Sequence, residues 1–98
     1  MKSMSVSPSN RDAKKLKAVF KSDGKTKTVH FGQKGSSTYL DHKNKQKRTN
    51  YIKRHSANEK HLWSDPTKPA TLSRFILWGP STSLRDAVSK YKRRFKLK

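Results

Sequence analysis

Residues 29–55 read VHFGQKGSSTYLDHKNKQKRTNYIKRH and join three features that together decide the fold. The stretch begins at the end of a strand pattern, passes through a loop with two glycines, and ends in a very basic segment with helical character. A dense run of cations indicates contact with a polyanion such as nucleic acid. We therefore treat residues 29–55 as the candidate working face and work outward from it.

A strand pattern leads into this stretch from the N-terminal side. Every second residue from Leu16 to Phe20 is apolar on one face, a period of two that is typical of a half-buried strand. The pair Asp23-Gly24 follows and favours a tight turn, because both residues tolerate positive φ. The alternation then resumes over residues 26–31. The sequence therefore predicts a β-hairpin from about Lys14 to Phe31.

Two glycines, Gly32 and Gly35, mark the loop after this hairpin. Positive φ at both would allow backbone amides to converge on an anion. The simpler interpretation is that they release the strand into a loop. The loop lacks the Lys-Ser/Thr ending of a nucleotide phosphate loop, so the sequence does not indicate nucleotide hydrolysis.

A basic helix is predicted from about residue 39 to 55. Thr38 and Asp41 have the spacing of a capping box at its start. Like-charge pairs such as Lys43 with Lys47 cost about 0.2–0.5 kcal/mol each, so docking on the hairpin through Leu40, Tyr51 and Ile52 is expected to offset them. A solvated helix without a partner is the alternative.

Candidate contacts to a polyanion lie in the loop and along this helix. Tyr39 or Tyr51 would stack on exposed bases, and the cations would neutralise phosphates. The candidate nucleic-acid-binding residues are Lys34, Tyr39, His42, Lys43, Lys45, Lys47, Arg48, Tyr51, Lys53 and Arg54.

The C-terminal half reads as a connector and two helices. Pro66 and Pro69 interrupt any helix after residue 56, and an apolar run then predicts a short buried helix over 70–78. Gly79 is expected to end it at positive φ. Ser83 and Asp86 predict a second capping box, which opens an amphipathic helix over 83–95.

The expected fold class is α+β, with an N-terminal β-hairpin packed against about three α-helices. Residues 1–12 are rich in Ser and predict a flexible tail, and residues 13–98 are expected to form a single small basic domain. Apolar positions define the expected core: Leu16, Ala18, Phe20, Val29, Phe31, Tyr51, Ile52, Trp63, Phe75, Ile76, Trp78, Leu84, Val88 and Tyr91.

Composition limits the possible partners and compartments. The 98 residues include 25 Lys and Arg against six Asp and Glu, a formal charge of +19, so self-repulsion opposes folding and stability should depend on salt. There is no cysteine, no apolar run near the roughly 18 residues of a membrane span, and no signal-peptide pattern. We expect a protein without membrane contact or secretion.

Catalytic constellations are missing from the sequence. The four histidines lack i,i+4 spacing on a predicted helix, the six acids are dispersed, and the serines fall in caps and tails. We therefore predict no enzyme activity, no cofactor, no metal and no small-molecule substrate.

Several short motifs along the chain carry a resemblance to a known group. They are His30-Phe31-Gly32, Gly35, Tyr39, His42-Lys43, Arg48, Tyr51, Arg54-His55, Trp63, Ser73-Arg74 and Leu77-Trp78. In this order they resemble small basic proteins of unknown function encoded by large double-stranded DNA viruses. The loop Gly-Ser-Ser-Thr-Tyr departs from the bulkier residue and the acid that the group has before Tyr39. The resemblance implies a viral origin and a DNA-packing or capsid-associated role. With that origin, the expected location is a virion or the host cytoplasm or nucleus.

Two functions follow as expectations. The first is a non-catalytic protein that binds nucleic-acid phosphates with little sequence specificity, with DNA as the expected nucleic acid. The alternative is a minor capsid or other virion structural protein whose cations contact acidic shell proteins.

Overall fold

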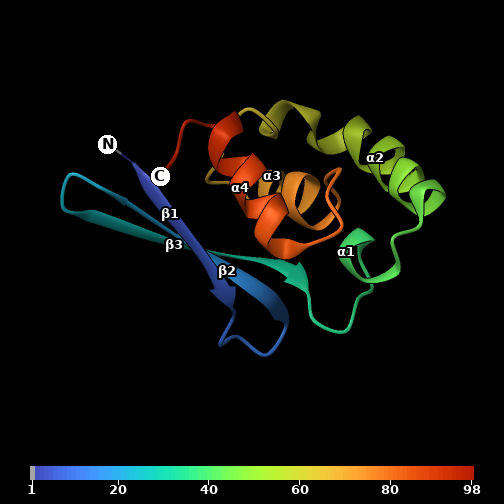
Figure 1. The fold of residues 1–98 in the computed structure, drawn as a ribbon, viewed down its shortest axis with the longest axis horizontal. Helices are drawn as coiled ribbons and strands as arrows, with labels where there is room; N and C mark the ends of the chain where they lie inside the picture. The colour runs from blue at the N-terminus through green and yellow to red at the C-terminus, as the bar shows by residue number, and fades with distance from the viewer. Residues whose placement is uncertain (1) are drawn as a thin grey trace.

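The computed structural model describes residues 2–98, which form a three-stranded antiparallel sheet followed by helices (Figure 1). The strands lie in the order β1-β2-β3. They are β1 (Ser3–Pro8), β2 (Lys14–Ser22) and β3 (Lys25–Gln33). The helical elements are α1 (Tyr39–His42), α2 (Lys45–Glu59), the 3₁₀ turn η1 (Lys60–Leu62), α3 (Pro69–Leu72), the π-helical turn η2 (Ser73–Leu77) and α4 (Leu84–Arg94). The predicted α+β class is confirmed.

The predicted hairpin is confirmed as β2 and β3. Its register runs from Ser22 opposite Lys25 to Lys14 opposite Gln33. The turn residues Asp23 and Gly24 have φ of 48° and 81°, as their tolerance for positive φ predicts.

The predicted flexible tail is wrong over β1. Residues Ser3–Pro8 pair with β2, and Met4 lies opposite Phe20 with 3 % of its surface exposed. Met1 lies outside the described residues. The signal was the alternation of Met4 and Val6 with serines, which an edge strand tolerates well. The outer edge of β1 is occupied by the chain end, where the Met4 amide donates to the Lys98 carbonyl at 2.7 Å.

The core lies between one face of the sheet and the C-terminal helices. Phe31 from β3, Ile76 from η2 and Tyr91 from α4 are each at most 1 % exposed. Figure 1 shows α3 and α4 on the same side of the sheet. The short buried helix over 70–78 is therefore confirmed, as α3 continued by η2. Leu84 is 36 % exposed, so its place in the predicted core is wrong: it stands in the first turn of α4, at the rim of the core.

Two predicted helix ends differ from expectation. Gly79 does not have positive φ; a Cβ there would lie 2.3 Å from the Phe75 carbonyl oxygen, so glycine is needed for close approach. At the start of α4, Ser83 Oγ accepts from the Asp86 amide, but the Asp86 carboxylate accepts from the Ser81 hydroxyl at 2.7 Å. Only half of the second capping box is formed.

The predicted continuous helix over 39–55 is wrong, because the chain turns between α1 and α2. Asp41 accepts from the Thr38 amide, so the first capping box is confirmed. Lys43 then adopts a left-handed conformation with φ of 54°. Asn44 begins α2, and its side-chain oxygen accepts from the amides of Gln46 and Lys47. Asn is among the strongest N-cap residues, and its amide oxygen starts a new helix here.

Candidate functional site

Aromatic rings from α1, from α2 and from Trp78, the residue after η2, form a continuous stack that holds α2 to the body. The Tyr51 ring lies 4.0 Å from the His55 ring and 4.3 Å from the Trp78 ring, at interplanar angles of 23° and 5°. The His42 ring lies 5.3 Å from Trp78 on a tilted plane. Within Lys45–Glu59, Tyr51 is the one buried residue, so α2 docks through this stack, not on the hairpin as predicted. We call His42, Tyr51, His55 and Trp78 the aromatic stack.

Arg48 fixes the same junction from the polar side. Its Nε donates to the carbonyl oxygens of Trp78 and Gly79, both at 3.0 Å. These carbonyls end the α3–η2 segment, where backbone acceptors lack helical partners and carry partial negative charge. The guanidinium also lies over the Tyr39 ring, 5.7 Å from its centroid. Arg48 therefore serves as a C-terminal cap supplied by another helix.

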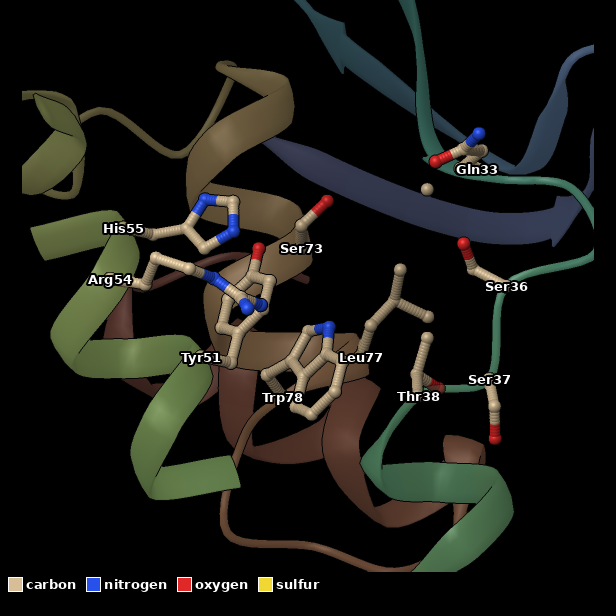
Figure 2. Close-up of a pocket in the computed structure, with 11 residues that line it drawn as sticks. Gln33, Ser36, Ser37, Thr38, Tyr51, Arg54, His55, Ser73, Leu77 and Trp78 are labelled. Atoms are coloured by element: carbon tan, nitrogen blue, oxygen red, sulfur yellow. The ribbon is translucent and has the colours of Figure 1, made fainter. Parts of the chain in front are cut away.

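A pocket of about 410 Å³ opens beside the aromatic stack (Figure 2). One wall is the loop after β3, which contributes Gln33, Ser36, Ser37 and Thr38. The opposite wall comes from α2 and from the α3–η2 segment, which contribute Tyr51, Arg54, His55, Ser73, Leu77 and Trp78.

Gly32 allows the loop after β3 to lie close to η2, so that the two walls of the pocket approach each other. It has φ of 79°, and a Cβ at this position would lie 2.8 Å from Leu77 Cδ1 and 3.1 Å from Lys15 Cβ. A side chain would push the loop away from η2. Gly35 also has positive φ, at 87°, with open space around it. The amides of Lys34 and Ser36 donate to the Ala13 and Gln33 carbonyls, so much of the loop backbone is already paired within the protein.

Two acids near the pocket, Asp41 and Glu59, are paired with neighbouring groups of the protein. Asp41 accepts from Thr38 and from Lys15 Nζ at 3.2 Å; the Thr38 amide is the main cause that lowers the pKa of Asp41, followed by Lys15. Glu59 pairs with His55 Nδ1 at 2.6 Å, and because a carboxylate only accepts, the ring proton lies on Nδ1. Burial raises the pKa of Tyr51 to about 12, with a further contribution from Glu59, so its hydroxyl stays protonated.

The sequence-predicted site residues divide into two groups. Six are exposed cations: Lys34, Lys43, Lys45, Lys47, Lys53 and Arg54. The other four lie within the junction: Tyr39, His42, Arg48 and Tyr51. Tyr39 and Tyr51 are only 5 % and 9 % exposed, so the expectation that their rings are open for stacking on bases is wrong.

Most cations on the surface lack an acidic partner. Of the Lys and Arg residues over 2–98, only Lys15 and Lys90 form an ion pair with a carboxylate. The exposed cations of α2 therefore have no carboxylate partner among residues 2–98.

A second cluster of rings and guanidinium groups lies near η1 and the end of α4. The Arg94 guanidinium lies 4.0 Å from the Phe75 ring centroid, and Arg74 lies 5.3 Å from that of Trp63. Burial lowers the pKa of Arg74, as do the charges of Arg48 and Arg94. Arg74 Nη1 also donates to the Trp78 carbonyl at 3.4 Å, so this cluster supplies a second donor to a carbonyl oxygen that Arg48 caps.

Residues 2–98 contain no cluster of three or more His, Asp or Glu side chains placed to hold a metal ion. Across the same residues, no helix has the length and apolar character that a membrane span requires.

Comparison with known proteins identifies the family. Residues 4–55 match the model of a family of unknown function, DUF5754. The chain belongs to this family. It is also 38 % identical over 80 residues to the uncharacterized protein L851 of Acanthamoeba polyphaga mimivirus, covering 76 % of this chain and 80 % of that protein. No solved structure matches the chain. The expected relationship to viral proteins of unknown function is confirmed by this relative.

The matched residues cover β1 to the middle of α2, so DUF5754 includes the loop wall and α2 wall of the pocket. Nine pocket residues were missing from the predicted site, namely Gly32, Gln33, Ser36, Ser37, Thr38, His55, Ser73, Leu77 and Trp78. A signal was available for five of them, since Gly32, His55, Ser73, Leu77 and Trp78 stand among the motifs that carry the viral resemblance.

Proposed function

We propose that this member of DUF5754 is a non-catalytic protein that binds nucleic acid, DNA in the first place, through phosphate contacts with little sequence preference. The observation that carries the proposal is the row of exposed cations along the second helix, none of which is paired with a carboxylate among the described residues. Unpaired surface cations favour a polyanionic partner because binding releases the counterions condensed on the nucleic acid.

The geometry of α2 supports a multivalent contact. Its fifteen residues extend over about 22 Å, a length along which duplex DNA presents several phosphates. Tyr51 and Arg48 fasten the inner face, which leaves Lys47 and Lys53 exposed on the outside and Arg54 exposed beside the pocket. A rigidly docked helix keeps these charges together and lowers the entropic cost of forming several contacts at once.

A salt titration tests the electrostatic basis of the proposal. Fluorescence anisotropy would be measured with random-sequence duplex, single strand and polyglutamate. Contact with about five phosphates predicts that log affinity for duplex falls against log salt with a slope of about −4 to −5. A flat salt response contradicts the proposal. Tighter binding of polyglutamate than of DNA at matched charge would favour the alternative, a virion protein that contacts acidic shell proteins.

Two charge variants test the role of α2. The first replaces four exposed lysines by Gln: Lys43, Lys45, Lys47 and Lys53. The matched control removes four cations from α4 and the residues after it: Arg85, Lys92, Arg93 and Lys96. Only the first variant should lose several-fold affinity for duplex. Equal losses would mean that the partner responds to net charge alone, and α2 would have no special role.

A further inference from the structure

The pocket beside the aromatic stack contains many hydrogen-bond donors that have no partner within residues 2–98. These groups are the hydroxyls of Ser36, Ser37, Tyr51 and Ser73, the indole Nε1 of Trp78, and the guanidinium of Arg54. These donors keep access to water, because the buried side-chain atoms without a partner among residues 2–98 belong to His42, Trp63 and Arg74, outside the pocket. A ligand that displaces this water must offer acceptors in its place, so the gathering of donors favours an acceptor-rich ligand. Figure 2 shows them on both walls of the opening.

Within residues 2–98, the side chains that line this pocket supply no carboxylate that would repel an anion. Of the described residues that line it, none is Asp or Glu. The two nearest acids are engaged elsewhere: Asp41 accepts from Thr38 and Lys15, and Glu59 accepts from His55. Arg54 is the one Lys or Arg among the described lining residues, and its planar guanidinium has a fork of donors that matches the oxygens of a phosphate.

The volume of the pocket and its apolar side indicate a ligand that is larger than an inorganic anion. The volume of about 410 Å³ lies in the range of sites for small organic molecules, which runs from about 300 to 1,000 Å³. Trp78 and Leu77 give the pocket an apolar side next to the donors. A phosphate alone would leave this side uncovered, whereas a base or sugar joined to a phosphate would bury it.

We propose that this pocket holds one nucleotide, with its phosphate on Arg54 and the hydroxyl donors and its base or sugar against Trp78 and Leu77. This inference rests on the proposed nucleic-acid binding and names the unit that is held. The loop after β3 then contacts the ligand through its side-chain hydroxyls, because some of its backbone amides are already paired within the protein.

The experiment uses Trp78 as its own reporter. The chain contains two tryptophans, so Trp63→Phe leaves only Trp78 to emit. This protein would be titrated with a nucleoside 5′-monophosphate, with the same nucleoside, and with inorganic phosphate. The nucleotide should give a saturable change in emission, and each of the other two should bind about tenfold more weakly or worse. Equal affinity for the nucleoside or for inorganic phosphate would overturn the proposal.

A matched pair of variants on α2 locates the phosphate. Arg54→Gln and Lys53→Gln remove the same charge from adjacent exposed positions, but only Arg54 lines the pocket. Arg54→Gln should weaken the nucleotide about tenfold, whereas Lys53→Gln should change it less than about twofold. Equal effects of the two variants would refute the assignment. Circular dichroism of both confirms that the fold is kept.

The two levels of the proposal fail in different ways. Loss of nucleotide binding with duplex binding intact would overturn the pocket and leave the proposed function standing. Nucleotide binding without duplex or single-strand binding would overturn the proposed function. A pentanucleotide with unphosphorylated ends distinguishes a nucleotide within a strand from a free nucleotide. If it changes Trp78 emission and Arg54→Gln weakens that binding, the pocket holds a nucleotide of a strand. If it leaves Trp78 emission unchanged, the ligand is a free nucleotide.

Discussion

Replacement of Arg48 by Gln should unfold the junction that holds α2, although Arg48 looks from the sequence like one more surface cation. In the structure its Nε donates to the Trp78 and Gly79 carbonyls at 3.0 Å, and the guanidinium lies over Tyr39. A glutamine side chain is shorter and uncharged, so it cannot cap both carbonyls from α2. Arg74 Nη1, 3.4 Å from the Trp78 carbonyl, would be the remaining donor.

The expected loss follows from these contacts. Hydrogen bonds that involve a charged group contribute about 1.5–3 kcal/mol, and a partly exposed cation–π contact adds about 0.5–1 kcal/mol. Relief of repulsion with neighbouring lysines offsets a few tenths of a kcal/mol. We expect a net loss of about 2 kcal/mol in the free energy of unfolding, which lowers Tm by roughly 8–16 °C in a chain of this size.

Urea denaturation followed by circular dichroism measures this loss against two controls. Lys47→Gln removes the same charge from an exposed neighbour and should change stability by less than about 0.5 kcal/mol. Arg48→Lys keeps the charge but loses the planar fork, so it should retain only part of the stability. If Arg48→Gln and Lys47→Gln unfold at the same urea concentration, the cap has no energetic role and the reasoning is refuted.

Three further predictions test other parts of the fold. Gly32→Ala should cost about 1–3 kcal/mol more than Gly35→Ala in urea denaturation, because only at Gly32 would the added Cβ meet Leu77; equal costs would refute this. Asp41 has a lowered pKa, so it stabilises the fold above its ordinary pKa and loses this effect as pH falls through the folded value. Asp41→Asn should therefore flatten the fall in stability below about pH 4, and an unchanged profile would contradict it. Deletion of residues 2–9 should cost at least about 2 kcal/mol by the same assay, since it removes β1; a loss within error would show that β1 contributes nothing.

The β2–β3 hairpin and the last two helical segments were predictable because local signals agreed with the tertiary fold there. The Asp23-Gly24 turn fixes the register of β2 and β3, and the apolar period marks which face is buried. For β1 the alternation of apolar residues was short. Half of its residues are serine, a composition that is more typical of a flexible tail. Its strand state depends on pairing with β2 and on the chain end at Lys98, and both are long-range contacts.

The region of the candidate site could be predicted from the sequence, but the arrangement of its side chains could not. The exposed lysines of α2 were found because charge is visible in sequence. The roles of Arg48 and Arg54 were not distinguishable, since both are arginines on a basic segment. What separates them is the turn at Lys43 and Asn44, which sets the rotation of α2 so that Arg48 faces Trp78 and Arg54 faces the pocket.

The charge on α2 explains why so much of its attachment is aromatic and polar. A helix with few apolar residues cannot dock by hydrophobic burial alone, and its like charges oppose docking. The stack of Tyr51 on Trp78 and the cap from Arg48 supply attachment without using the outer face. That outer face keeps its repulsion until an anion lies against it. A bound polyanion would therefore relieve strain in α2 as well as gain contacts, which couples occupation of this surface to the stability of the junction below it.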